Sequence, residues 1–291
     1  MIKFTATKEI ISFAKGANRI MKKYDKDACS KRFIGGIIFT NGKMIYSDGH
    51  VIAEKTISEG NWDIEGKKTL YAGFDLFKKF LDLKQGDLIK MWNAKEEGKK
   101  DFQRCDIYNT FMQVNEEDAI SCINYSYDNM ESLIHEKSNQ RRNDWDAVAV
   151  FDFKELKDSI KESLKKYSYG RHNCSEIWKE EDKYFYGEKD YGIVSGEVKG
   201  LIEGEIKYMI DKHISGDTYL SFICARNVAL SLMCAPSKTS KVTIKMQRDC
   251  LSEIEFTVNG EIAQDIKCYM YNPLKTFENE KENNDIYGSI K

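Results

Sequence analysis

The sequence has no apolar run of about 18 residues, and it contains only two prolines, Pro236 and Pro273. The first absence argues against a helix that crosses a membrane, because such a helix needs about 20 apolar residues. The scarcity of proline argues against Pro-rich linkers. The N-terminal stretch MIKFTATKEI also lacks the long apolar core of a signal peptide. We therefore expect a cytoplasmic protein without membrane partners.

The sequence also lacks the short motifs that mark catalytic and metal sites. None of the eight cysteines is spaced as CxxC, and the four histidines form no HExxH pair. No serine lies in a GxSxG elbow, and no glycine-rich stretch has the GxGxxG or GxxxxGK[ST] spacing of a phosphate-binding loop. The SDGH stretch at 47–50 is explained by a hairpin turn. We expect reduced thiols, no metal, no cofactor and no catalysis.

Charge is abundant but nearly balanced. Lys and Arg number 45 and Asp and Glu number 47, which gives a net charge of −2 for 291 residues. The chain is therefore not globally basic, and any nucleic-acid binding would depend on a local cationic surface. The length predicts about two domains, each large enough for its own core.

Residues 3–26 predict a short strand followed by an amphipathic helix. One helical face carries apolar residues at the expected spacing, namely Ile10, Phe13, Ala14, Ala17, Ile20, Met21 and Tyr24. The other face is cationic and contains Lys8, Ser12, Lys15, Arg19, Lys22, Lys23 and Lys26. Glu9 is the only acid between Lys8 and Lys23. An ordinary solvated helix mixes acids with bases, because like charges one turn apart repel each other.

The same order of elements is predicted twice along the chain. After the first helix, strands are expected at 33–39, 44–47, 51–57 and 68–72, then a short helix at 74–83 and strands at 88–93 and 104–114, with the charged stretch KEEGKKD as a turn between the last two. Residues 115–146 are polar, with weak periodicity, and are interpreted as a connector. Its RRND tract allows contact with a polyanion, although a solvated linker explains it better.

The second half restarts with a strand at 147–151. Asp152 and Glu155 resemble a capping box in front of a helix over 153–167. That helix has an outward lysine stripe, flanked by acids, and further strands follow around 174–179, 183–186, 192–198, 203–208 and 218–223. A short helix is expected over 226–234, a hairpin over 241–259 and a closing strand over 266–271.

These residues resemble the DNA sliding clamp family, and the beta subunit of bacterial DNA polymerase III in particular. The resemblance rests on the opening MIKFTATKEIISFAKGANRI, on GKMIYSDGHVIAEKTI, on KKTLYAGFDLF and on the closing pieces GDTYLSFICARNVALSLM, KVTIKM, EIEFTVNG and IKCYMYNPL. It implies an α+β fold in which each domain has antiparallel sheets outside and two helices inside. The implied division is a first clamp-like domain at 1–130, a linker at 131–146, a second domain at 147–275 and a polar tail at 276–291.

The resemblance also implies an assembly and partners. In that family, six domains close a ring around duplex DNA, and the beta subunit contributes three per chain. This chain has room for two, so a ring would need a homotrimer, as in the two-domain clamps of archaea and eukaryotes. The implied partners are duplex DNA, a DNA polymerase or another DNA-handling protein, and a possible clamp loader. The protein-binding region falls on the closing strand, at Tyr269, Met270, Tyr271, Pro273 and Leu274.

The residues expected to contact DNA are cations on the predicted helices. A sliding protein needs diffuse phosphate contacts that do not depend on base sequence. The candidates are Lys8, Lys15, Arg19, Lys22, Lys23, Lys78, Lys79, Lys154, Lys157, Lys161, Lys165 and Arg226. Two alternatives stay open. One is a clamp-like protein-binding scaffold that does not encircle DNA, and the other is a single-strand binder that stacks bases on Tyr184, Phe185, Tyr186 and Tyr191.

Overall fold

The chain forms two compact units, which we describe separately. The computed structural model describes residues 1–24, 37–40, 42–47, 51–57, 69–72, 74–100, 106–125, 145, 147–166, 176–180, 183–188, 193–206, 223–246 and 252–270. The first unit comprises Met1–Asn139 together with Met233–Ser237 and Ala263–Cys268. The second comprises Gln140–Leu232, Lys238–Ile262 and Tyr269–Lys291. The predicted polar tail and nearly all of the predicted linker lie outside the described residues.

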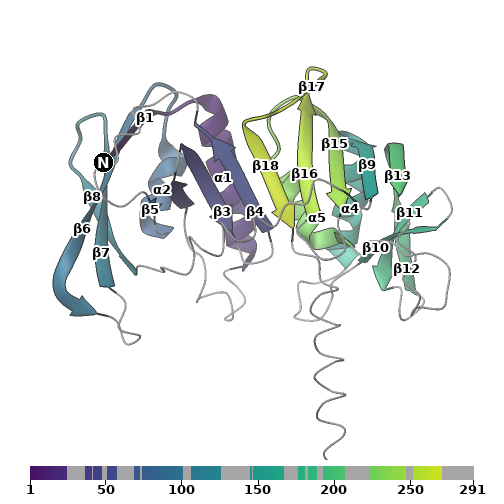
Figure 1. Cartoon of the computed structure of the whole chain (residues 1–291), viewed down its shortest axis with the longest axis horizontal. Helices are drawn as coiled ribbons and strands as arrows, with labels where there is room; N and C mark the ends of the chain where they lie inside the picture. Colours follow the sequence, from purple (N-terminus) through teal and green to yellow (C-terminus); the bar gives the residue numbers. More distant parts are fainter. Residues whose placement is uncertain are drawn as a thin grey trace, which may run out of the picture. The chain divides into compact units, whose positions relative to one another are not determined.

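The described residues of the first unit form two antiparallel sheets and the helices α1 and α2 (Figure 1). One sheet has the order β1-β6-β7-β8, and the other contains the run β5-β2-β3-β4. In chain order the elements are β1 (Ile2–Thr5), α1 (Lys8–Tyr24), β2 (Ile37–Thr40), β3 (Lys43–Ser47), β4 (Val51–Thr56), β5 (Thr69–Ala72), α2 (Phe74–Asp82), β6 (Leu88–Lys100), β7 (Asp106–Val114) and β8 (Ile120–Tyr125).

The second unit is built from the same kinds of element. One sheet has the order β12-β11-β10-β14, and the other contains β13-β9-β15-β16, with β18 after β16. Only the end of β18 is assigned to the second unit, because its residues up to Cys268 are assigned to the first. The elements are β9 (Ala147–Asp152), α4 (Phe153–Lys166), β10 (Glu176–Glu180), β11 (Lys183–Glu188), β12 (Ile193–Val198), β13 (Leu201–Ile206), β14 (Ile223–Cys224), α5 (Ala225–Leu232), β15 (Thr239–Met246), β16 (Ser252–Val258), β17 (Glu261–Ile262) and β18 (Ile266–Met270).

The two units repeat one topology. The order β1-β6-β7-β8 corresponds to β9-β15-β16-β18, and β5-β2-β3-β4 corresponds to β14-β10-β11-β12. The helices match as α1 with α4 and α2 with α5. Strand β13, which pairs with β9, has no counterpart among the described strands of the first unit. The repeated order predicted from the sequence is therefore confirmed at the level of strand pairing.

Within the described residues, α1 packs beside α2 and α4 beside α5, in each case against strands of both sheets. In the first unit, α2 contacts β5 of one sheet and β8 of the other. Four phenylalanine rings stack within this unit, with Phe80 at 6.3 Å from Phe4, 5.5 Å from Phe39 and 6.3 Å from Phe77 between ring centroids. Because Phe4 and Phe39 come from different sheets, this cluster joins both sheets to α2.

The second unit joins its sheets with a smaller aromatic contact. Phe151 on β9 meets Tyr184 on β11 edge to face, with ring centroids 5.3 Å apart. Helix α4 adds Leu156 and Ile160, both fully buried, to this core. Asp152 caps the helix as predicted, because its Oδ1 accepts the amides of Lys154 at 2.9 Å and Glu155 at 3.0 Å.

Two sequence-based expectations in the first unit were wrong. The charged stretch 95–101 was expected to be a turn, but β6 continues through it to Lys100 and stays paired with β7, with an irregular register between Lys95 and Lys100. Residues 120–125, assigned to a connector, form β8 and pair with β7. In both places, pairing with the neighbouring strand β7 outweighed weak local strand signals.

Candidate nucleic-acid interface

Helix α1 presents cations on the face that its apolar stripe leaves free. Ile10, Phe13, Ala14 and Ala17 are buried, whereas Lys8 and Lys15 are exposed. The two lysines are seven positions apart, which places them on one side of the helix two turns from each other. The backbone of Arg19, Lys22 and Lys23 belongs to the same helix. The structure describes nothing of those three side chains.

Helix α2 adds cations beside α1. Lys78 and Lys79 are exposed, while Phe77 and Phe80 point into the core. Because α1 and α2 pack against each other, the first unit carries exposed lysines on two adjacent helices. The sequence prediction of outward lysines on both helices is confirmed for these side chains. Their contact with DNA stays a proposal.

Helix α4 carries the matching lysines of the second unit. Lys154, Lys157 and Lys161 are exposed at positions i, i+3 and i+7 of one stripe. The ammonium of Lys157 lies 5.2 Å from the centroid of the Phe153 ring, a cation–π contact. Glu155 and Asp158 are exposed on the same helix, so this surface is less cationic than that of α1. The side chains of Lys165 and of Arg226 on α5 lie outside the described set.

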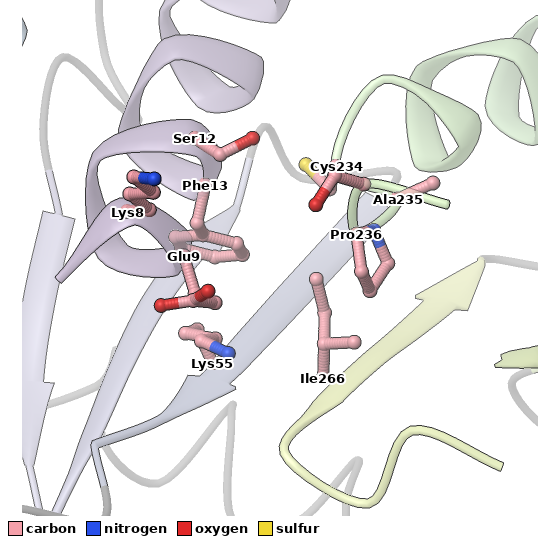
Figure 2. A pocket seen from close by; sticks show the side chains of 10 residues that line it. Lys8, Glu9, Ser12, Phe13, Lys55, Cys234, Ala235, Pro236 and Ile266 are labelled. Atoms are coloured by element: carbon pink, nitrogen blue, oxygen red, sulfur yellow. The ribbon is translucent and has the colours of Figure 1, made fainter. Parts of the chain in front are cut away.

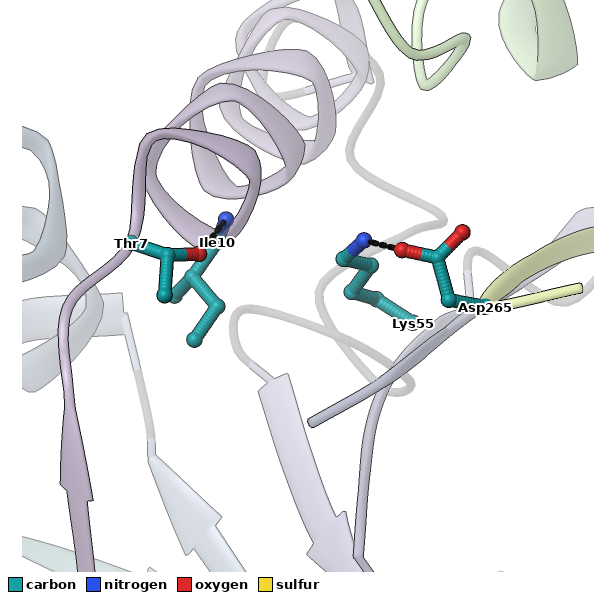
Figure 3. A network of polar contacts seen from close by, with 4 residues as sticks. All are labelled: Thr7, Ile10, Lys55 and Asp265. Atoms are coloured by element: carbon teal, nitrogen blue, oxygen red, sulfur yellow. Dashed lines mark hydrogen bonds and ion pairs between the residues drawn. The ribbon is translucent and has the colours of Figure 1, made fainter. Parts of the chain in front are cut away.

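The start of α1 is capped by Thr7, whose Oγ1 accepts the amide of Ile10 at 3.3 Å (Figure 3). The Glu9 carboxylate accepts a hydrogen bond from the backbone amide of Glu9 and a second one from the Thr7 hydroxyl. Both hydrogen bonds lower the pKa of Glu9. Glu9, the acid beside the cationic face of α1, is thus hydrogen-bonded by groups at the start of this helix. Its carboxylate is held in the ionised form to lower pH than an ordinary glutamate.

Halfway along α1, Gly16 lets a second segment approach the helix backbone. A Cβ atom at this position would lie 2.4 Å from the carbonyl oxygen of Met233, which is closer than real contacts allow. Met233–Ser237 belong to the first unit although they follow α5 in sequence. Gly16 therefore fixes where this segment meets α1.

The segment after α5 and the start of β18 form a pocket with α1 and β4, within the first unit. Its volume is about 270 Å³. Figure 2 shows Glu9, Phe13 and Lys55 on one side and Cys234, Pro236 and Ile266 on the other. Lys55 has only 6% of its side chain exposed and pairs with Asp265 (Figure 3). The amide of Thr56 also donates to the Asp265 carbonyl at 2.7 Å.

This pocket was not anticipated from the sequence. Its walls come from positions more than 200 residues apart, so no local pattern brings them together. One signal was present, since Glu54 and Lys55 are charged residues within a strand that otherwise reads as half-buried. Both are buried here, and a buried ammonium requires an anionic partner.

The predicted partner-binding residues lie on and after β18. Tyr269 and Met270 are buried, with 3% and 1% of their surface exposed. Tyr271, Pro273 and Leu274 lie outside the described residues. The assignment of this region to partner binding stays a prediction, and β18 offers a partner little surface through its last two side chains.

Tyr184 does not suit the single-strand alternative. Its ring is 2% exposed, its hydroxyl has no hydrogen-bond partner in the described part of the chain, and burial raises its pKa to about 12. A buried ring cannot stack on a base. The side chains of Tyr186 and Tyr191 lie outside the described residues.

Within the described residues, no cluster of histidine, cysteine or acidic side chains has the arrangement of a metal site. Cys234 and Cys268 are buried, and neither forms a disulfide bond within the described residues. None of the described helices is both long and apolar enough to cross a membrane.

Comparison with known proteins gives a clear structural likeness. No protein-family model matches the chain, and neither does any curated protein sequence. Among solved structures, the Helicobacter pylori beta clamp bound to a DNA ligase peptide matches 92% of this chain, with a TM-score of 0.54 and 12% identity. DNA polymerase III subunit beta from Borrelia burgdorferi, in complex with a natural product, matches 93% with a TM-score of 0.51 and 14% identity.

A third structure, the DNA polymerase III beta chain of Streptococcus pneumoniae, matches 92% of the chain with a TM-score of 0.54 and 10% identity. The chain spans 64%, 63% and 63% of the lengths of these three proteins. Identities this low carry information about the fold alone. The three structural matches, together with the repeated α+β topology, show that this chain has the sliding-clamp fold.

Proposed function

We propose that this protein is a DNA sliding clamp, a non-catalytic factor that encircles duplex DNA and tethers a DNA polymerase to it. The observation that carries the proposal is the repeat of one topology with exposed lysines on the first helix of each unit. Phosphate contacts from such lysines are independent of sequence and are weakened by salt. A protein that slides along DNA needs contacts of this kind, and topology rather than affinity then retains it.

The strand edges support a closed homo-oligomer. In the first unit, the amide of Thr56 at the end of β4 donates a hydrogen bond to the carbonyl oxygen of Asp265, just before β18. In the repeated topology, β8 of the first unit corresponds to β18, and β12 of the second unit corresponds to β4. Among the described strands, β8 and β12 each lie at the end of a sheet. Open strand edges are templates for pairing with another chain. Head-to-tail pairing of β8 with β12 of the next copy closes a ring when the rotation fits, and three copies supply six units.

Partner proteins are the finer part of the proposal. One structural neighbour was solved with a DNA ligase peptide bound. We place the partner region of this chain at Tyr269–Leu274, and we expect peptides of a polymerase, or of another DNA-handling protein, to bind there. A clamp loader is a further expected partner.

The direct test distinguishes encirclement from surface binding without needing a loader. The protein is mixed with linear duplex DNA that has free ends, and the ends are then blocked with bulky protein caps. At a salt concentration that screens phosphate contacts, a ring is retained only when the ends are blocked after mixing. Equal loss from blocked and open DNA contradicts encirclement. Light scattering at micromolar concentration is expected to give the mass of a trimer.

The cationic face is tested by reversing charge at Lys15, Arg19 and Lys22 together. We expect at least a tenfold loss of retention at moderate salt, with unchanged circular dichroism. The matched control reverses Lys183, Lys199 and Lys241, three exposed lysines off the helices, for the same change in net charge. Equal loss in both triple variants would mean that net charge, rather than the α1 face, drives binding. A folded monomer with no retention favours the protein-binding scaffold.

A further inference from the structure

The pocket beside α1 has no role in the proposed function, and its lining combines charges of both signs. Lys8 and Glu9 border it at the start of α1, and Ser12 adds a hydroxyl one turn later. Lys55 also lines it, but its ammonium is paired with Asp265. The lining therefore offers one carboxylate and one ammonium that are not committed to that ion pair, and its charges sum to zero once Asp265 is included.

This balance decides the charge of a suitable ligand. A net anion such as phosphate would face the Glu9 carboxylate, whose low pKa keeps it ionised at neutral pH. A net cation would face Lys8 and the Lys55 ammonium. A molecule with an ammonium and a carboxylate places opposite charges against both.

The rest of the lining is mainly apolar, although Ser237 adds a second hydroxyl. Ala235 and Pro236 are partly exposed, and Pro236 lies next to Ile266 across the pocket from Glu9 and Phe13 (Figure 2). The volume of about 270 Å³ lies just below the range of about 300–1,000 Å³ that is typical of drug-sized ligands. The occupant is therefore small, with one apolar group.

We propose that this pocket binds a small zwitterion with an apolar side chain, that is, a free amino acid or a molecule of that chemistry. Its ammonium lies at Glu9, its carboxylate lies at Lys8 and Ser12, and its side chain lies against Pro236. This site shares Lys8 with the contacts proposed for DNA on α1 and α2, so ligand binding is measured without DNA.

Three probes that share a phenyl ring test the proposal on the full-length protein without DNA. L-phenylalanine carries both charges, phenethylamine carries only the ammonium, and 3-phenylpropionate carries only the carboxylate. Ligand-observed NMR titration is expected to give a dissociation constant for L-phenylalanine at least tenfold lower than for either singly charged probe. Equal binding of all three, or no binding at millimolar concentration, overturns the proposal. Tighter binding of inorganic phosphate than of L-phenylalanine also overturns it.

Two variants locate the site. Glu9→Gln is expected to abolish the preference for L-phenylalanine over 3-phenylpropionate, because the neutral amide no longer attracts the ammonium of one probe and no longer repels the carboxylate of the other. Ser12→Phe, at an exposed helix position, is expected to fill the pocket and abolish binding of all three probes. The matched control is Glu203→Gln, an exposed glutamate on β13. A loss in Glu203→Gln equal to that in Glu9→Gln would show that binding occurs elsewhere and would refute the assignment.

Discussion

In the first unit, Phe80 stacks on three other phenylalanines that come from both sheets and from α2 itself. Among the described residues of the second unit, one edge-to-face aromatic pair, Phe151 with Tyr184, joins the two sheets. The topology is the same, so these differences show that strand order does not dictate how a core is filled. The surface differs as well, since α1 has one acid among its cations where α4 carries several.

The largest expected loss of stability comes from truncating a ring in the aromatic cores. Phe80→Ala removes three ring contacts and leaves a cavity at the centre of the cluster, so we expect it to destabilise the first unit by about 4–5 kcal/mol. Phe151→Ala removes one ring contact and should destabilise the second unit by about 3 kcal/mol. Hydrogen exchange, which reports each unit separately, measures both.

The wild-type protein and a Phe39→Leu variant serve as references for the core experiment, because leucine keeps most of the buried volume at one edge of the cluster. A loss for Phe151→Ala that equals or exceeds the loss for Phe80→Ala would refute the contrast between the two cores. A loss spread evenly over both units would show that they unfold together.

Two glycines give the next contrast. Gly16→Ala places a methyl group against the Met233 carbonyl, and we expect a cost of about 1–3 kcal/mol from overpacking. Gly200→Ala faces the Glu155 Cβ at 2.8 Å and also has φ of +92°, which adds about 1–2 kcal/mol of backbone strain. Urea denaturation should therefore show the larger loss for Gly200→Ala. The reverse order would indicate that the Met233 segment cannot move away from α1.

Helix capping gives the smallest effect. Asp152 accepts two amides at the start of α4, whereas Thr7 accepts one longer hydrogen bond at the start of α1. We expect Asp152→Ala to cost about 1–2 kcal/mol and Thr7→Ala about 0.5–1 kcal/mol, by thermal denaturation. Asp152→Asn keeps an acceptor oxygen and is the control that should retain most of the stability. A larger loss for Thr7→Ala would mean that its bond to Glu9 matters more than the amide it accepts.

The helices were predictable because each signals its buried face locally. The spacing of Phe77 and Phe80 or of Leu156 and Ile160 is enough to place the helix and its exposed lysines. The extension of β6 through Lys100 was not predictable, because a run of charged residues favours a turn until β7 pairs with it. The same holds for β8, whose residues 120–125 lack a clear alternation.

The candidate DNA surface was predictable from local sequence patterns, whereas the pocket was not. Exposure of Lys8, Lys15 and the α4 lysines follows from helical periodicity, which is a property of neighbouring residues. The pairing of Lys55 with Asp265 joins positions 210 residues apart, and only the fold brings them together. Low sequence identity with the structural neighbours leaves no motif that would reveal such a contact.

The buried hydroxyl of Tyr184 also makes its ionisation a spectroscopic signal of whether the second unit is folded. Because its pKa is raised to about 12 while an ordinary tyrosine ionises near 10, it stays protonated in alkaline solution for as long as the second unit is closed. Opening of that unit near pH 11 would convert it to phenolate, which absorbs at longer wavelength. In Tyr184→Phe this delayed spectral change disappears, and the protein loses a buried polar atom with no hydrogen bond among the described residues. Removing one oxygen atom should therefore cost the fold little and leave it better protected from base.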